Sequence, residues 1–373
     1  MIEGKNIAIL TLLYKNYNYG GILQAYALNH VLERMGYNAE VVKYDRSIKK
    51  RTFVERVKNK LSKLIHKKIE NEQDSVFFHN VIMEKKKMFD SFVEKNINQS
   101  NKVYSQINEN DILQYDIYIC GSDQVWSPVS GRPAMFLNFV PSTTKKIAYA
   151  ASIGADSISN EYAEAIKPLI ERINFVSVRE EGAYKILNEM LPHKPCTVAL
   201  DPTLLLSVDD WKNVESKVSI LDNEQYVLIY MIGENDETWI TAYEHALTLN
   251  CRIINIPFNK MIYTKHDEDY KDISLFNVGP GEFLWLIEHA SYVLTDSFHG
   301  MVFSLLFHKR YKIYTRTVEN ENGSMNGRLI SLLNLLQAPD DNLFSNADFN
   351  VIEERIQRER EKSIDFLKKA LED

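Results

Sequence analysis

Four short segments of this sequence place polar or glycine residues directly after an apolar stretch. They are residues 16–21 (NYNYGG), 121–126 (GSDQVW), 177–179 (SVR) and 295–300 (TDSFHG). Together they offer a guanidinium, an imidazole, a carboxylate and amides, which bind anions, exchange protons and contact hydroxyl groups. Ligands of open α/β sheets bind at the carboxyl ends of the strands. We therefore expect these segments to contribute to one ligand site.

Arg179 and His299 carry the charge and proton chemistry of these segments. Arg179 ends an expected strand at 175–178, where a guanidinium suits bidentate binding of a carboxylate or phosphate. A salt bridge with Glu180 or Glu181 is the alternative role. The imidazole of His299 can donate and accept protons near neutrality, although a histidine here can also simply cap or pack. Gly300 beside it opens an expected helix whose start suits an anion.

The other two segments suit a hydroxylated ligand. Asp123 is placed to accept a proton or hydrogen bond from a sugar hydroxyl, with Trp126 offering a flat surface to the ring. Alternatively, Asp123 caps a helix and Trp126 packs in the core. Gly20 and Gly21 let backbone N–H groups approach a ligand at a helix start, but the GxGxxG spacing of dinucleotide sites is absent, and the pair can serve only to turn the chain.

Apolar strands alternate with amphipathic helices along the chain, which predicts parallel sheets. The first series of expected strands comprises residues 7–12, 40–44, 117–120, 147–152, 175–178 and 197–199. The second series comprises residues 226–232, 252–256, 292–295 and 310–314. Each series is typical of a Rossmann-like unit. Their strand ends would face a shared crevice between the two units.

A length of 373 residues favours two domains, because it exceeds what one core usually supports. We expect an N-terminal Rossmann-like domain at 1–206 on the acceptor side, with a basic helical insertion at about 49–95. A C-terminal Rossmann-like domain at 207–345 would form the donor side. The charged helix expected at 346–373 carries an apolar stripe and would pack back on the N-terminal domain.

Composition excludes several classes of function. A formal charge of −7 disfavours a nucleic-acid partner, and no apolar run reaches the roughly 20 residues of a membrane span. The apolar stretch at 7–10 is too short for an export signal, which favours a soluble, cytoplasmic protein. Three widely spaced cysteines argue against a disulfide framework or a Cys-rich zinc site. No metal-ligand spacing is visible, so we expect no metal.

The segment at 49–68 opposes the overall charge, because its nine lysines and arginines face one acid, Glu55. Apolar residues recur within it at helical spacing. One interpretation is a solvated helix face over a small core contact. The other is peripheral contact with the inner surface of the cytoplasmic membrane, near a lipid diphosphate.

From about residue 7 to about residue 336 the sequence resembles the polysaccharide pyruvyl transferase family. The residues that carry the resemblance are NYGG with the following QAYAL, GSDQVW, YAASIG at 149–154, SVR, Asp201-Pro202 and TDSFHG. The resemblance implies a GT-B-like fold of two Rossmann-like domains. It also implies transfer of a carboxyethylidene group from phosphoenolpyruvate, as co-substrate, onto two sugar hydroxyls as a cyclic ketal. The acceptor would be a bacterial surface polysaccharide or its lipid-linked oligosaccharide precursor.

The same resemblance assigns roles to particular residues. Arg179 matches a donor-binding arginine, and His299 matches the histidine of an Arg-Leu-His motif. This chain has Ser297 where many members have the arginine of that motif, so Arg328, or else Arg316, would replace it. The expected roles are then His299 as acid and Asp123 as base. The donor would contact Arg179, Ser297, His299, Gly300 and Arg328; the acceptor would contact Asn18, Tyr19, Gly20, Gly21, Asp123 and Trp126.

Two other functions stay open. The fold alone is compatible with a sugar-nucleotide-dependent GT-B glycosyltransferase, since fold does not fix chemistry. Ser297, in place of the family arginine, suggests a catalytically degenerate glycan-binding protein.

Overall fold

The computed structural model describes residues 4–45, 72–104, 115–129, 131–221, 224–233, 235–257, 273–316, 319–320, 323–324, 326–342 and 348–373. The basic segment at 49–68 lies outside these residues, and its expected membrane contact stays a prediction. Within the described part of the chain, no helix is long and apolar enough to cross a membrane.

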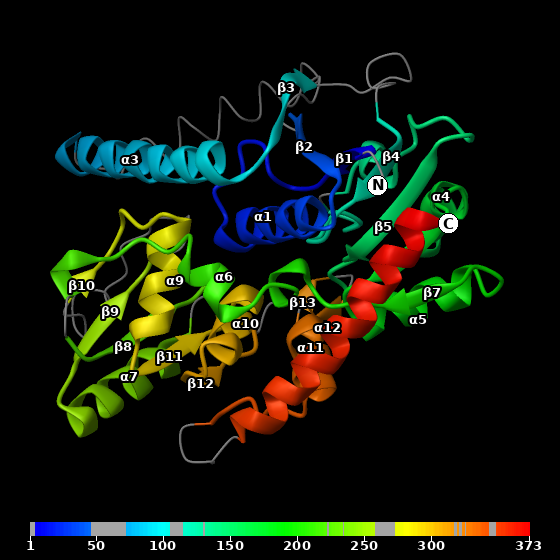
Figure 1. The fold of residues 1–373 in the computed structure, drawn as a ribbon. Coiled ribbons are helices and arrows are strands. Elements are labelled where there is room, and N and C mark those ends of the chain that lie inside the picture. Colours follow the sequence, from blue (N-terminus) through cyan, green and yellow to red (C-terminus); the bar gives the residue numbers. More distant parts are fainter. Residues whose placement is uncertain are drawn as a thin grey trace.

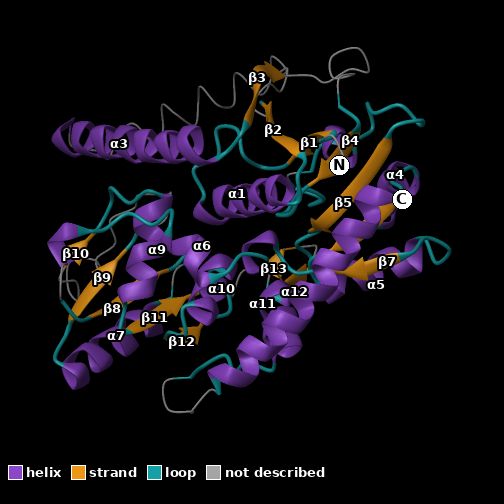
Figure 2. Ribbon diagram, viewed as in Figure 1, coloured by secondary structure: helices purple, strands orange, loops and turns teal. Residues whose placement is uncertain are grey.

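Two parallel sheets, shown in Figures 1 and 2, form the framework. The first has the order β3-β2-β1-β4-β5-β6-β7, and its connections include helices α1, α3, α4 and α5. Its strands are β1 (Asn6–Leu10), β2 (Asn38–Tyr44), β3 (Gln99–Tyr104), β4 (Ile117–Cys120), β5 (Lys145–Ala151), β6 (Phe175–Val178) and β7 (Cys196–Val198). The helices are α1 (Tyr19–Arg34), α3 (Glu72–Asn96), α4 (Asn160–Glu171) and α5 (Glu181–Met190).

The second sheet has the order β10-β9-β8-β11-β12 and is also parallel. Its strands are β8 (Tyr226–Tyr230), β9 (Arg252–Asn255), β10 (Ile273–Ser274), β11 (Tyr292–Thr295) and β12 (Arg310–Ile313). The associated helices are α6 (Val208–Lys212), α7 (Asp236–Leu249), α9 (Pro280–His289), α10 (Phe298–Leu306) and α11 (Gly327–Leu336). The predicted α/β class with two Rossmann-like units is confirmed.

The central strands are apolar on both faces because helices cover both sides of a parallel sheet. Every residue of β4 and β8 is buried, for example. The two halves also share one continuous apolar cluster. Tyr19, at the start of α1, stacks on Phe283 of α9 with ring centroids 4.3 Å apart, and its hydroxyl donates to the carbonyl of Val278. Aromatic packing therefore fixes α1 of the first half against the second half.

The C-terminal helix α12 (Phe349–Glu372) returns from the second half to the first, as Figure 1 shows in red. Its Ser363 Oγ accepts a hydrogen bond from the backbone N–H of Leu200, and Arg360 donates to the carbonyls of Leu204 and Leu206. Near its end, the carbonyl of Leu371 accepts from Lys145 on β5. The predicted return of this helix is confirmed.

Candidate active site

The strand order places the site. In the first sheet, β1 to β3 follow one another toward one edge and β4 to β7 toward the other edge, so the strand order changes direction between β1 and β4. In the second sheet it changes direction between β8 and β11. Such switch points open a crevice at the carboxyl ends of the strands. A cavity of about 280 Å³ lies where the two crevices meet. Its lining comes from the segments after these four strands, from Arg316 and from α11: Leu12, Asn16, Asn18, Asp123, Gln124, Ile232, Ser297, Phe298, His299, Arg316 and Arg328.

Glycines at the start of α1 allow the two halves to approach. Asn18 caps the helix by accepting a hydrogen bond from the N–H of Gly21 at 3.2 Å. A Cβ on Gly20 would overlap the imidazole of His299, and a Cβ on Gly21 would overlap the Asn16 amide and come within 3.2 Å of Asp123 Oδ2. The glycine pair therefore does more than turn the chain, because only glycine leaves room for these side chains.

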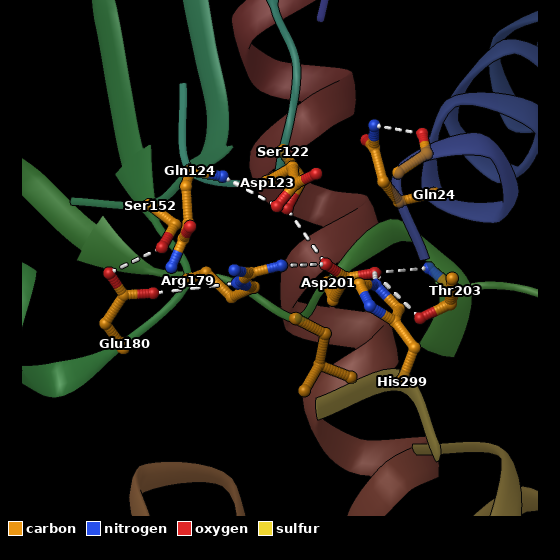
Figure 3. Close-up of polar contacts among 12 residues, drawn as sticks. Gln24, Ser122, Asp123, Gln124, Ser152, Arg179, Glu180, Asp201, Thr203 and His299 are labelled. Carbon is orange, nitrogen blue, oxygen red and sulfur yellow. Dashed lines mark hydrogen bonds and ion pairs between the residues drawn. The ribbon is translucent and has the colours of Figure 1, made fainter. Parts of the chain in front are cut away.

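Asp201 is the centre of the buried polar network in Figure 3. One carboxylate oxygen, Oδ2, accepts hydrogen bonds from Arg179 Nη1 at 2.7 Å and from Ser122 Oγ at 2.9 Å. The other, Oδ1, accepts from the backbone N–H of Thr203 at 3.0 Å and from its hydroxyl at 2.7 Å. Although burial opposes ionisation, His299 and Arg179 hold the pKa of Asp201 well below its usual range.

Arg179 is enclosed by this network and does not line the cavity. Its side chain is 1% exposed, and its Nε lies 3.6 Å from an oxygen of Glu180. The other oxygen of Glu180 accepts from Ser152 Oγ and from the N–H groups of residues 153 and 154. The guanidinium carbon lies 4.5 Å from the centre of the Phe298 ring. The alternative role foreseen for Arg179, an ion pair with Glu180, is thus present, with Asp201 as the stronger partner.

His299 reaches the same carboxylate from the second half. It is the second residue of α10, which begins at Phe298 and is capped by Ser297, whose Oγ accepts from the N–H of Gly300. The Nε2 atom lies 3.6 Å from Asp201 Oδ1, too far for a hydrogen bond. Arg179 and His299, expected to act together, are therefore joined through Asp201 across the interface.

Gly300 does not line the cavity, and its N–H is used within the helix cap. A Cβ there would come within 2.5 Å of Thr295 Oγ1, so the residue serves the tight turn from β11 into α10. Its expected direct contact with the donor is wrong in this structure. The reason is that α10 starts two residues earlier than the predicted helix.

Two further arginines line the cavity beside Ser297. Arg316 donates to Asp296, from Nε to the carboxylate at 3.0 Å and from Nη2 to the carbonyl at 3.0 Å. Arg328, near the start of α11, makes no ion pair within the described residues, and its buried Nε has no hydrogen-bond partner there. Burial, and then repulsion by Arg179, lower its pKa to about 10. Of the two arginines that line the cavity, Arg328 is therefore the one whose charge is not paired among the described residues.

Asp123 lines the opposite wall in an unusual backbone conformation. Its φ of 76° lies in the left-handed region, which non-glycine residues seldom adopt. Its Oδ1 accepts from the N–H of Gln124 at 2.8 Å. Since strained backbone of this kind clusters at ligand sites, the conformation supports a ligand role for the carboxylate.

Of the expected acceptor set, only Asn18 and Asp123 line the cavity: Gly20 and Gly21 lie behind it and leave room for neighbouring side chains, and Tyr19 and Trp126 lie elsewhere. Trp126 is fully buried, stacks on Phe136 at 5.4 Å and donates from Nε1 to the carbonyl of Met135. Tyr19 is 2% exposed and packed on Phe283. Neither ring can offer a face to a sugar, so their assignment to the acceptor was wrong. Trp126 instead has the core role that was its alternative.

Sequence reasoning did not single out Asp201, Glu180 or Phe298 as site residues. From the sequence, Asp201-Pro202 was only one of the motifs that carry the family resemblance, with no role assigned to it. A carboxylate before proline is a frequent helix cap, and Asp201 does cap the short 3₁₀ helix Pro202–Leu204. No sequence signal indicates that its second oxygen would hold Arg179. No group of three or more possible metal ligands occurs among the residues the structure describes.

Comparisons with known proteins agree with this arrangement. Solved structures that share the fold include three described as UDP-N-acetylglucosamine 2-epimerases. The Listeria monocytogenes protein, so assigned provisionally, is 12% identical over 98% of this chain and 90% of its own, with a TM-score of 0.54. The Methanocaldococcus jannaschii enzyme is 12% identical over 94% and 91%, with a TM-score of 0.51. The Neisseria meningitidis enzyme bound to UDP-GlcNAc is 12% identical over 98% and 100%, with a TM-score of 0.50.

At this identity the likeness shows the fold, a GT-B-like pair of Rossmann domains, and not the chemistry. No protein of curated function matches the sequence. The sequence profile of one family, described as polysaccharide pyruvyl transferase, matches residues 18–310, which include the cavity residues from Asn18 to His299 but not Leu12, Asn16, Arg316 or Arg328. On that match the chain is a transferase, and it belongs to the polysaccharide pyruvyl transferase family.

Proposed function

We propose that this chain transfers a carboxyethylidene group from phosphoenolpyruvate to a sugar of a bacterial surface polysaccharide, or of its lipid-linked precursor, as a cyclic ketal. One observation carries the proposal. A guanidinium without an ion-pair partner among the described residues, Arg328, shares a cavity with His299 and Asp123. Anion binding, protonation and deprotonation are thus available around one space of about 280 Å³.

The donor carries a carboxylate and a phosphate, and both need fixed positive charge or N–H groups. Arg328 takes one of them with its unpaired Nε edge, and Arg316 adds charge from the same wall. This arrangement supports Arg328 as the substitute for the family arginine that is absent at Ser297. In this arrangement Arg179 does not contact the donor directly. Its guanidinium lies against Phe298, and Phe298 lines the cavity.

The chemistry begins with a proton. His299, as imidazolium, gives it to the methylene carbon of the donor, and the adjacent carbon becomes electrophilic. A sugar hydroxyl attacks that carbon and loses its proton to Asp123. The bond from this carbon to the phosphate oxygen breaks, and phosphate leaves with the proton that Asp123 had taken. A second hydroxyl then attacks the same carbon, returns a proton to His299 and closes the ketal ring.

The acceptor lies on the wall formed by Asn16, Asn18, Asp123 and Gln124. These side chains are well suited to orient sugar hydroxyls, since amides both donate and accept hydrogen bonds and the carboxylate accepts them. The scheme uses no metal or further cofactor. A cytoplasmic site at the membrane surface, where lipid-linked precursors are found, completes the proposal.

Calorimetry with phosphoenolpyruvate tests the donor. Arg328→Ala should weaken donor binding at least tenfold, because a charge-assisted pair contributes roughly 1.5–3 kcal/mol. Arg252→Ala is the matched control: Arg252, on β9, forms a surface ion pair with Glu224, and its loss should leave binding unchanged. Phosphate release with acceptor glycans then tests the transfer. Binding of UDP-GlcNAc in place of phosphoenolpyruvate would support a glycosyltransferase, and a fully functional His299→Ala variant would support a glycan-binding protein.

A further inference from the structure

The two ring nitrogens of His299 lie in different surroundings. Nε2 is buried, has no hydrogen-bond partner, and faces Asp201 Oδ1 at 3.6 Å. Nδ1 is the ring atom nearest Gly20, since a Cβ at that position would overlap this atom most closely, and the imidazole is part of the cavity lining. The two nitrogens therefore face different sides: Nε2 faces Asp201, and Nδ1 faces the start of α1 at Gly20.

We propose that Asp201 is a positioning residue, whose carboxylate accepts the Nε2–H of His299 and so leaves Nδ1 as the atom that exchanges protons with substrate. This inference rests on the proposed function for its catalytic consequence. The tautomer of His299 does not depend on that function. A carboxylate behind an imidazole fixes both the ring orientation and the tautomer, and it stabilises the imidazolium that gives up the proton.

Asp201 is well placed for this role because it is rigid. Four hydrogen bonds from Ser122, Arg179 and Thr203 hold its two oxygens, and all of these donors belong to the first half of the molecule. The carboxylate is fully buried, so no exposed side-chain motion competes with these bonds. Arg179 Nη1, 2.7 Å from Oδ2, also favours the ionised carboxylate.

His299 belongs to the second half, so the pair spans the interface. An N–H···O bond is usually 2.7–3.2 Å long, and the present 3.6 Å separation exceeds that by about half an ångström. Hydrogen bonds of catalytic groups commonly tighten only when substrate is bound. A small approach of α10 toward the loop before Pro202 is enough to complete this bond.

The first test is the tautomer of neutral His299 in the full-length protein without substrate. Long-range ¹H–¹⁵N spectra distinguish protonated from unprotonated ring nitrogens, and a His299→Gln variant assigns the signal among the nine histidines. The expected result is a proton on Nε2. Thr203→Val and Ser122→Ala each remove one bond to Asp201 but keep the carboxylate opposite the ring, and both should keep this tautomer. A proton on Nδ1 in the native protein would overturn the inference.

The second test is kinetic. Asp201→Asn should change the tautomer distribution and lower kcat by about 100-fold or more, with KM for phosphoenolpyruvate changed by less, because the loss is in positioning. The Thr203→Val and Ser122→Ala variants should lose far less. If Asp201→Asn keeps kcat within threefold while His299→Gln is inactive, Asp201 does not position the histidine. If the native protein releases no phosphate from phosphoenolpyruvate, the proposed function fails. The tautomer measurement then still decides whether Asp201 pairs with His299.

Discussion

Replacing Gly20 with alanine should disable His299 while the fold persists. The new methyl group would overlap Nδ1 and the adjoining carbons of the imidazole, so the ring or α1 must move. Overpacking of this kind costs about 1–3 kcal/mol, offset by up to about 1 kcal/mol from the better helix propensity of alanine. A displacement of about 1 Å at a proton-transfer group lowers kcat by about 100-fold. We therefore expect a large loss of phosphate release and a small loss of stability.

The measurements are kcat with phosphoenolpyruvate and an acceptor, and the urea midpoint of unfolding. Gly182→Ala is the matched control, because a Cβ at that position of α5 has its nearest neighbour at 3.7 Å, an ordinary contact. In a His299→Ala background the methyl group meets no ring, so Gly20→Ala should then lose most of its destabilising effect. Equal losses of stability in the two backgrounds, or full activity of Gly20→Ala alone, would refute the contact.

Three further predictions concern other parts of the molecule. Burial and the charge of Glu288 raise the pKa of Glu215 to about 7, so the folded state holds more protons than the unfolded state between about pH 4.5 and 7 and stability falls as pH rises through that window. In urea unfolding, Glu215→Gln should therefore raise the free energy of unfolding at pH 8 by about 1 kcal/mol after allowance for solvent screening, and leave it unchanged near pH 4; equal shifts at both pH values would contradict this. Ser363→Ala removes the acceptor of the Leu200 N–H and should lower the free energy of unfolding in urea by about 1–3 kcal/mol. An unchanged free energy of unfolding would mean that this hydrogen bond does not hold α12 in place. The full chain should bind anionic liposomes through residues 49–68, and binding that does not weaken with salt would reject this.

Much of the fold follows from local patterns. Strands such as β4 and β8 are continuous apolar runs bounded by polar turns, so the sequence predicts both the strands and the residues at their ends. By contrast, β3 was not predicted, because its sequence QSNKVY is largely polar and exposed at the sheet edge. The domain boundaries at residues 206 and 345 stay predictions.

The site was predictable in its position but not in its contacts. Strand ends of parallel sheets converge, which is why Asp123 and His299 were expected together and do line one cavity. Arg328, near the start of α11, was expected there only as the substitute for the family arginine that is absent at Ser297. Whether an arginine faces the ligand or a buried carboxylate depends on partners distant in the sequence. Arg179 is paired by Asp201, 22 residues later, and no spacing rule encodes that pair. Trp126 shows the same limit, since an aromatic residue in a turn packs or binds according to what surrounds it.

The central claim is that phosphoenolpyruvate is held between Arg328 and His299. A crystal structure with phosphoenolpyruvate bound tests this most directly. We predict an oxygen of the donor at about 3 Å from the Arg328 guanidinium, with the methylene carbon facing Nδ1 of His299. Donor density outside this cavity, or an Arg328 that contacts only protein while the donor is bound, would contradict it.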